Sequence, residues 1–135
     1  MEDIFVGRLM SSPIQTVTED TPMEEAASVM AEHGISSVVV VDDANELVGI
    51  VTATDFVAIA ADGDITRDRP VSEYMSTDLV TVTADEPIAT AANRIVRNNI
   101  HHVPVVDETA GVIGMLSTTD LTAYLSTVVT PDPSV

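Results

Sequence analysis

The chain of 135 residues contains no cysteine, no tryptophan and no lysine. The missing cysteine excludes disulfides, thiolate catalysis and zinc sites built on cysteine, and it fits a reducing cytoplasm. Aromatic residues make up only 3% of the chain although hydrophobic residues reach 45%. Val, Ile, Ala, Leu and Met must therefore build the core. At this length we expect one domain or two very small ones, with enough chain to bury a core.

Long hydrophobic runs are absent as well. No apolar run approaches the roughly 20 residues that a membrane-spanning helix needs. The acidic start Met1-Glu2-Asp3 is the opposite of the basic start of a signal peptide. We therefore expect a soluble protein of the cytoplasm.

Basic residues are scarce. The chain carries 22 acidic and 5 basic residues, which gives a formal net charge of −17. Binding of nucleic acid or anionic lipid is driven mainly by basic contacts, so this surface disfavours both. The acids are spread along the whole chain, which argues against a single acidic patch for a basic partner. Because salt at about 1 M shortens the Debye length to about 3 Å and screens self-repulsion, we expect a halophilic source.

The motifs of common catalytic sites are missing too. The sequence has no H-E-x-x-H, no phosphate-binding Gly-Lys loop and no G-x-G-x-x-G. Gly63, Gly111 and Gly114 are wrongly spaced for such a loop. We therefore expect that the protein is not an enzyme.

What the chain does contain is an internal repeat. Residues 5–60 align with residues 70–125 at an offset of 65 without a gap, and 19 of these 56 positions are identical. The sequence therefore predicts two copies of one unit. The expected boundaries are a first repeat with its lead at 1–62, a linker at 63–69, a second repeat at 70–128 and a flexible tail at 129–135.

Each copy begins with a short apolar lead, a brief extended piece and a helix. In the first copy Thr21 is predicted to be the N-cap of this helix, with Pro22 at its first position and Glu24 closing a capping box. Gly34 is predicted to stop the helix, and Asn98-Asn99 to stop its counterpart.

Two strands and a closing helix follow in each copy. Val38–Val41 is a continuous β-branched run, which is typical of a strand buried on both faces, and Leu47–Val51 is the next strand. In the second copy Pro104 lacks an amide donor and indicates an edge strand or an irregular spot. The closing helices are expected over 53–61 and 118–128.

A unit of two or three strands and two helices is too small to bury its sheet alone. The sequence therefore predicts an α/β fold in which two tandem repeats, each a small sheet with two helices, pack through their sheets about a pseudo-twofold. Clefts would then form at the seam between the copies.

The most informative motif occurs once in each copy. Gly49–Asp55 reads G-I-V-T-A-T-D and Gly114–Asp120 reads G-M-L-S-T-T-D. Each runs from an apolar strand through a hydroxyl residue to a carboxylate at a helix start. A hydroxyl and helix-start amides suit a phosphate, and a carboxylate suits a ribose diol. The alternative reading is that the hydroxyl is a plain N-cap and the carboxylate merely stabilises its helix.

These features together resemble the CBS-domain pair, or Bateman module. The likeness rests on Met-Ser near each start, Thr-Val followed by Asp-x-Pro, the helix, the Val-rich strand ending in Asp, and G-h-h-[ST]-x-x-D; it covers about residues 5–126. The resemblance implies a regulatory module or energy sensor that binds AMP, ADP, ATP or S-adenosylmethionine in clefts between the repeats. No further cofactor would be required. The chain looks like a stand-alone pair that signals to an unidentified partner.

The resemblance also implies roles for single positions. Asp55 and Asp120 would accept hydrogen bonds from ribose hydroxyls. Residues near the phosphate would be Thr52, Thr54, Ser117 and Thr119. Residues lining the adenine, through backbone and aliphatic contacts, would be Thr16, Thr81, Ile35 to Val38 and Ile100 to Val103.

The two expected sites are not identical. His101 and His102 match positions where related repeats place basic phosphate contacts, whereas the first copy has Ser36 and Ser37 there. Adjacent residues of a strand point to opposite faces, so the two histidines are not expected to chelate one metal. No metal site is predicted.

Other basic and apolar residues leave alternatives open. Arg94 and Arg97 share a helix face and could neutralise a phosphate, pair with a partner chain or form solvated salt bridges, which we favour. The apolar residues of the closing helices could be core or dimer surface: Phe56, Val57, Ile59, Leu121, Tyr124, Leu125 and Val128. The resemblance implies a homodimer through these helices, a disc of four repeats.

Two rival functions remain at this point. In the first, the protein is a ligand-free dimerisation or interaction scaffold in which the motif carboxylates only cap helices. In the second, it is a regulator linked to nucleic acid, which the missing basic patch disfavours.

Overall fold

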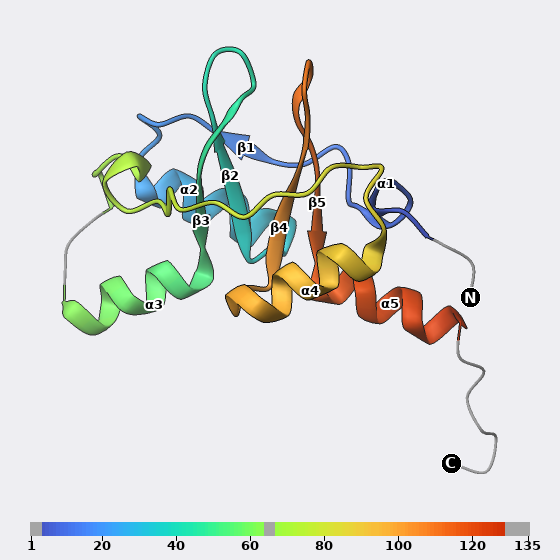
Figure 1. Cartoon of the computed structure of the whole chain (residues 1–135). Coiled ribbons are helices and arrows are strands. Elements are labelled where there is room, and N and C mark those ends of the chain that lie inside the picture. Colours follow the sequence, from blue (N-terminus) through green and yellow to red (C-terminus); the bar gives the residue numbers. More distant parts are fainter. Residues whose placement is uncertain (1–3, 64–66, 129–135) are drawn as a thin grey trace, which may run out of the picture. The chain divides into compact units, whose positions relative to one another are not determined.

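The computed structural model describes residues 4–63 and 67–128. Within these ranges the chain is a mixed α/β protein, and the two copies follow nearly the same element order (Figure 1). The predicted tail at 129–135 and residues 64–66 of the predicted linker lie outside the described residues. In the described part of the chain, no helix is long and apolar enough to cross a membrane.

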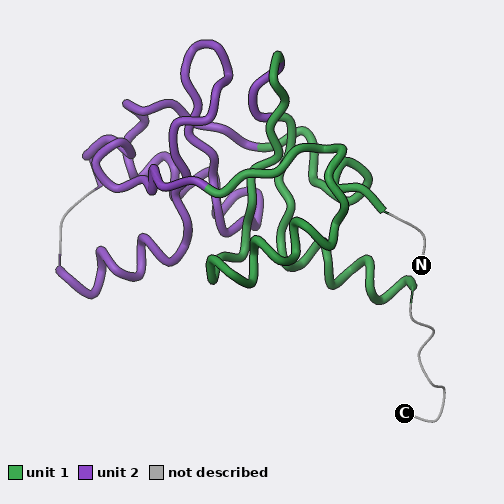
Figure 2. Tube along the Cα trace, viewed as in Figure 1, with its two compact units in different colours: residues 1–14, 80–109, 113–135 green, residues 15–79, 110–112 purple. Residues whose placement is uncertain are grey.

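The chain divides into two compact units (Figure 2). Unit 1 comprises residues 1–14, 80–109 and 113–135, and unit 2 comprises residues 15–79 and 110–112. Each unit therefore combines most of one repeat with the short lead of the other. The repeat boundaries inferred from the sequence stay a prediction, because the compact units are assembled across them.

Unit 2 contains a three-stranded sheet in the order β1 (Thr16–Val17), β2 (Ser37–Val41) and β3 (Leu47–Thr52). β1 pairs with β2 in parallel and β2 pairs with β3 antiparallel. All five residues of β2 are buried. This confirms the prediction that the β-branched run forms a strand covered on both faces.

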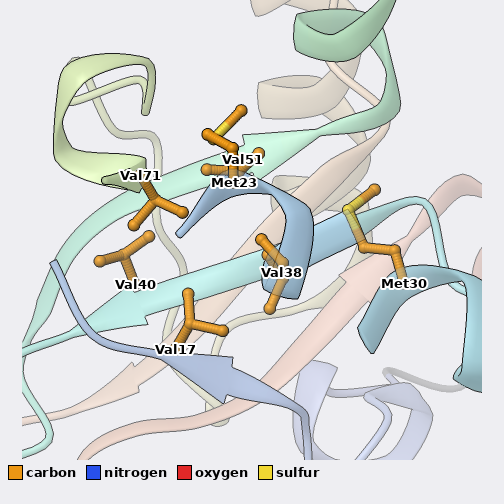
Figure 3. Packing of buried hydrophobic residues seen from close by; sticks show 8 residues of the cluster. Val17, Met23, Met30, Val38, Val40, Val51 and Val71 are labelled. Carbon is orange, nitrogen blue, oxygen red and sulfur yellow. The ribbon is translucent and has the colours of Figure 1, made fainter. Parts of the chain in front are cut away.

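The core of unit 2 gathers around β2 (Figure 3). It receives side chains from α2 (Met23–His33), from all three strands and from η1 (Val71–Glu73), a 3₁₀ turn that belongs to the lead of the second copy. The buried members of this cluster are Val17, Met23, Ala26, Met30, Val38, Val40, Val51 and Val71. Aliphatic residues and methionine thus build the core, as the composition requires.

Both helices of unit 2 end at a glycine, which the sequence predicts for α2 alone. α2 stops at Gly34, whose φ of 61° is left-handed, and α3 (Ala53–Asp62) stops at Gly63 with φ 74°. A residue without Cβ adopts this conformation at little cost, and the cap amides of both glycines bond back to the last turn.

The start of α2 differs from the prediction. Thr21 is not the N-cap, because the helix begins at Met23 and Pro22 occupies the cap position without a side-chain cap. The Met23 amide donates to the carbonyl of Arg69 at 2.8 Å, and the Glu24 amide donates to that of Arg67 at 2.9 Å. The predicted capping box is therefore wrong: carbonyls more than 40 residues away in the sequence take the place of a local side chain.

The turn between β2 and β3 is hydrogen-bonded to the turn around residues 110–112. Asn45 has a left-handed φ of 62°, and its side-chain amide donates to the carbonyls of Ala110 and Val112, both at 2.9 Å. The Val112 amide returns a bond to the Asn45 carbonyl at 3.0 Å. A Cβ added at Gly111 would overlap that carbonyl. Asn45 thus attaches the tip of the second hairpin to unit 2.

The described residues of unit 1 form five elements. They are α1 (Val6–Leu9), α4 (Ile88–Asn98), β4 (His102–Asp107), most of β5 (Gly111–Ser117) and α5 (Thr118–Val128). α4 ends at Asn99 with a left-handed φ of 51°, which confirms that an asparagine replaces the stop glycine of the first copy.

Pro104 explains the smaller sheet of this unit. In unit 2 the pairs Thr16–Val39 and Val17–Val40 join β1 to β2. Pro104 is the counterpart of Val39, 65 residues later, and has no amide to donate. The corresponding pairing in unit 1 is an isolated bridge between Val82 and Val105. The predicted edge or irregular position is confirmed.

The leads pack against the glycine that opens each G-h-h-[ST]-x-x-D motif. Gly49 and Gly114 are both buried. A Cβ on Gly49 would press into the side chain of Met75, and one on Gly114 into that of Met10. The glycine is therefore needed for close packing of the lead, a structural role beside any role in a site.

Candidate functional site

The residues singled out from the first copy all belong to unit 2. We name this group the Asp55 centre; it consists of Thr16, Ile35, Val38, Thr52, Thr54 and Asp55, which all fall within residues 15–79. It forms where β3 runs directly into α3. Thr52 and Asp55 make a capping box at this junction, and Asp55 Oδ2 accepts the Thr52 amide at 2.8 Å.

The residues singled out from the second copy all belong to unit 1. We name this group the Asp120 centre; it consists of Thr81, Ile100, His101, His102, Val103, Ser117, Thr119 and Asp120. Asp120 Oδ2 accepts the Ser117 amide at 2.8 Å, and Ser117 Oγ accepts the Asp120 amide at 3.1 Å. The same local sequence thus folds into the same helix start twice.

A further bond ties each helix start to the strand beside it. The first amide of α3, on Ala53, donates to the carbonyl of Ser36 at 2.9 Å, and the first amide of α5, on Thr118, donates to that of His101 at 3.0 Å. These two bonds are equivalent at the offset of 65. They place Ser36 and His101 at the same point of their centres, next to the start of a helix.

Capping leaves part of each carboxylate available. Across residues 4–63 and 67–128, the hydrogen bonds to Asp55 and Asp120 all end on Oδ2. Both residues are half-buried, and an ionised carboxylate has about four acceptor positions. Oδ1 can therefore accept from an external donor such as a diol while Oδ2 holds the helix start. The same carboxylate can therefore both cap its helix and bind a ligand.

The remaining residues of the two centres differ in exposure. Thr16, Ile35, Thr54 and Thr119 are exposed, and Thr81 and Ile100 are half-buried. Val38 and Val103 are only 1% and 0% exposed, and their side chains belong to the two hydrophobic clusters. A ligand would therefore meet these two valines through their main chain.

The adjacent histidines also differ. His101 is exposed and His102 is half-buried. Burial lowers the pKa of His102, the neighbouring His101 lowers it further, and Asp120 acts in the opposite direction. His102 thus lies within electrostatic reach of the Asp120 carboxylate. Among the described residues, no group of three or more His, Asp or Glu side chains could hold a metal ion.

Arg94 has a structural role at the edge of the Asp120 centre. Its guanidinium lies 2.8 Å from Glu86 Oε2 and donates to the carbonyl of Thr81 at 3.0 Å. This contact is the main cause of the lowered pKa of Glu86. The salt bridge predicted for Arg94 is confirmed, although the sequence did not indicate the bond to Thr81. Arg97 is exposed on the same helix.

An open depression beside this centre includes residues that the sequence analysis missed. Its lining comes from α5 alone: Thr118, Thr119, Thr122, Ala123 and Ser126. The spacing of these small residues at three and four positions was the available signal, since such positions share one helix face.

Comparison with a library of protein families gives two matches. The model of the family described as CBS domain matches residues 6–62 and again residues 71–127. These two matches cover most of the chain and coincide with the two copies of the repeat.

Curated proteins with similar sequences are of two kinds. An uncharacterized 17.7 kDa protein of Acidianus ambivalens is 34% identical over 120 residues, which are 89% of this chain and 72% of that protein. A homoserine O-acetyltransferase of Methanosalsum zhilinae is 32% identical over 121 residues, 90% of this chain but 24% of that enzyme. The chain thus spans about a quarter of the length of such enzymes.

Solved structures also match. The CBS domain pair of protein MJ0100, in complex with 5′-methylthioadenosine and S-adenosyl-L-methionine, superposes with a TM-score of 0.87 at 27% identity and covers 95% of this chain and 100% of that one. CBSX2 in complex with AMP has a TM-score of 0.81 at 21% identity, covering 92% of this chain and 97% of that one. The latter likeness shows a shared fold.

Proposed function

The chain belongs to the CBS domain family and carries two copies of the domain, and from this premise we propose that it is a regulatory module that binds adenine nucleotides. The ligand class would be AMP, ADP, ATP or S-adenosylmethionine. One observation carries the proposal: each copy presents a carboxylate whose Oδ2 caps a helix while Oδ1 stays available to a ribose diol. The complex of a similar CBS pair with 5′-methylthioadenosine and S-adenosyl-L-methionine supports it.

Signalling would follow from differential binding. A ligand shifts a conformational equilibrium only if it binds the two states with different affinity. We propose that the bound nucleotide favours one conformation of the pair and that an unidentified protein partner reads this conformation. A cytoplasmic location and a role in energy sensing belong to the same proposal.

Thermal unfolding in the presence of ligands tests the function. The full chain is heated with AMP, ADP, ATP, S-adenosylmethionine or adenosine. A ligand at 100 times its dissociation constant adds about 2.7 kcal/mol of stability, which raises the midpoint by several degrees in a chain of this size. No shift with any compound, on folded and ligand-free protein, would favour the interaction scaffold instead.

Paired substitutions separate ligand binding from capping. Asp120→Ala removes both oxygens and should abolish binding at one centre, and Asp55→Ala should do so at the other. Asp120→Glu keeps a capping-box carboxylate but moves its free oxygen, so it should weaken binding while leaving the helix start intact. Asp43→Ala, which removes an exposed acid elsewhere, is the control for charge. Unchanged titrations for both alanine variants would refute the ribose assignment.

The closing helices supply a surface for a second copy of this chain, and we propose a homodimer. Phe56, Ile59 and Leu121 pack against the two cores. Val57 and Leu125, by contrast, are 69% and 57% exposed. α5 carries a single charged residue in a chain of net charge −17, so charge repulsion between two copies is weak at this helix.

Sedimentation equilibrium tests the dimer. The native chain should give twice its 14.3 kDa mass. Leu125→Glu should produce monomers, because it places a desolvated charge in the interface. Val96→Glu is the matched control, since Val96 is 77% exposed on α4. A dimer that is equally disrupted by both variants, or by neither, would contradict the proposed interface.

A further inference from the structure

The sulfur atoms of this protein all belong to methionine, because the chain has no cysteine. Five of the six methionines lie within residues 4–63 and 67–128. Three of these five are buried, with exposed fractions of 1%, 7% and 9%: Met23, Met30 and Met115. The other two, Met10 and Met75, are half-buried. A small oxidant dissolved in the solvent therefore reaches Met10 and Met75 more easily than the buried three.

These two methionines occupy the same position in the two copies, 65 residues apart. Each closes the short helical turn of its lead. The Met10 amide donates to the Val6 carbonyl at 2.9 Å, and the Met75 amide donates to the Val71 carbonyl at 2.8 Å. Each side chain also packs against the hydrophobic cluster of its own unit. The half-buried methionine is thus a repeated feature of the fold.

The sulfur atom of each methionine lies against a buried stretch of backbone. Met75 Sδ is the atom nearest to a Cβ built on Gly49, and Met10 Sδ is the atom nearest to one built on Gly114. The glycine thus closes one side of the sulfur, and the rest of the side chain packs on the core. Conversion to a sulfoxide would place a polar oxygen in this apolar contact, which is costly without a hydrogen-bond partner.

Backbone bonds attach the lead to the strand directly beside this contact. In unit 2 the residue after the methionine, Ser76, exchanges two bonds of 2.9 and 3.1 Å with Ile50 of β3. In unit 1 the corresponding Ser11 exchanges two bonds of 2.8 and 3.1 Å with Met115 of β5. We call these pairs the lead bridges of unit 2 and unit 1. Both strands run on into the helix starts of the Asp55 and Asp120 centres.

We propose that Met10 and Met75 are sites of oxidative modification, and that a peroxide acting on them releases each lead from the strand beside it. The sulfur attacks one oxygen of hydrogen peroxide: the S–O bond forms, the O–O bond breaks, and the second oxygen leaves as water. The thioether loses two electrons and becomes a sulfoxide, and the peroxide is reduced. This response to oxidants goes beyond the proposed function, because it needs no ligand in either centre.

Peptide mapping by mass spectrometry tests the sites, after graded exposure of the full chain to hydrogen peroxide. Met10 and Met75 should gain an oxygen atom about tenfold faster than Met23 and Met30, because a buried sulfur is reached only when the chain opens. In concentrated urea the four rates should become equal, which controls for local sequence. Equal rates in the folded chain, or faster oxidation of Met23, overturn the assignment of the sites.

Hydrogen exchange of backbone amides tests the release of the leads. Leucine keeps an apolar side chain of similar volume without the sulfur, so Met10→Leu leaves Met75 as the reactive member of the pair. Peroxide should then speed exchange at the lead bridge of unit 2 by about tenfold or more, as for a local opening, and leave the bridge of unit 1 unchanged. Met75→Leu should give the reverse pattern. The bridge that is unaffected in the same molecule controls for a general loss of stability.

Two further variants complete the test. Met75→Gln places a polar group of similar length beside Gly49 without any oxidant, and it should also speed exchange at the lead bridge of unit 2. Met30→Leu is the matched control, since it removes a buried methionine of the same unit and should leave the response to peroxide as in the native chain. Unchanged exchange at both bridges after complete oxidation of Met10 and Met75, or equal acceleration of both bridges in Met10→Leu, overturns the proposed release.

Discussion

A single carboxylate at a helix start can perform two tasks with its two oxygens. In Asp55 and Asp120, Oδ2 accepts the amide of the N-cap residue and Oδ1 is left for another donor. The hydrogen bond that fixes the side chain also orients the free oxygen. Preorganisation of this kind lowers the entropy cost of binding.

The pKa of His102 gives a prediction at the residue scale. Burial lowers this pKa in the folded chain, with His101 adding to the effect and Asp120 opposing it. In the unfolded chain the imidazole returns to about 6.5, so the unfolded state binds more protons between the two values. The contribution of His102 to the free energy of unfolding should therefore be fully present above about pH 7, and it should be lost as the pH drops through 6.5.

Urea titrations between pH 5 and pH 7.5 measure this dependence. His102→Gln should flatten the profile in that interval, while Glu86, whose pKa is lowered by Arg94, acts only at more acidic pH. His33→Gln is the matched control because it removes another histidine and keeps His102. A profile that is equally steep in native protein and His102→Gln would contradict the assignment.

At the scale of elements, the sequence predicted the features that depend only on residues close together in the chain. The helix stops at Gly34 and Asn99 need a left-handed residue, and the buried strand β2 and the edge position of Pro104 follow from side-chain chemistry alone. All of these could be read from the residues themselves.

The start of α2 and the lead packing could not be predicted, because their partners are distant in the chain. Nothing near Thr21 indicates that the carbonyls of Arg67 and Arg69 replace a capping side chain. Similarly, Gly49 reads as part of a ligand motif, and its close contact with Met75 becomes visible only in the folded chain. At the candidate site, the motif gave the carboxylate and hydroxyl of each centre, but the bond from Arg94 to Thr81 depends on tertiary packing.

Gly111 gives a prediction at the element scale. Its φ of 78° is left-handed, and a Cβ there would overlap the Asn45 carbonyl. Gly34 has a similar φ of 61° but open space around it. Gly34→Ala should therefore cost only about 1–2 kcal/mol of unfolding free energy, the cost of a left-handed Cβ, whereas Gly111→Ala should cost distinctly more.

Chemical denaturation measures the loss of unfolding free energy in each variant. The difference between the two losses gives the stability that depends on the contact between the second hairpin tip and Asn45. Asn45→Gly provides an independent check, since it keeps the left-handed turn but removes both side-chain bonds. Equal losses in Gly111→Ala and Gly34→Ala would mean that the contact contributes nothing to stability.

At the scale of the whole molecule, charge dominates the surface. Within residues 4–63 and 67–128 the structure pairs three of the five arginines with acids, Arg67, Arg69 and Arg94. Five arginines are in any case too few to neutralise 22 acidic residues. Exposed pairs contribute little, so the long-range repulsion is largely uncompensated at low salt.

The midpoint of thermal unfolding should therefore rise with salt. Between 0.1 M and 1 M the Debye length shortens from about 10 Å to about 3 Å, which removes most of the repulsion. Circular dichroism in increasing KCl measures the effect, and sucrose, a stabiliser without charge, is the control. A midpoint that does not change over this range of KCl would contradict both the repulsion and the proposed halophilic source.

Each compact unit is completed by the lead of the other copy: residues 1–14 serve the second repeat, and the lead at 70–76 serves the first. A single copy of the repeat would therefore carry a lead that it does not use and lack the one that it needs. A single copy on its own could therefore complete its core only by exchanging leads with an identical chain. Joining the two copies in one chain replaces that association between two molecules with contacts inside one.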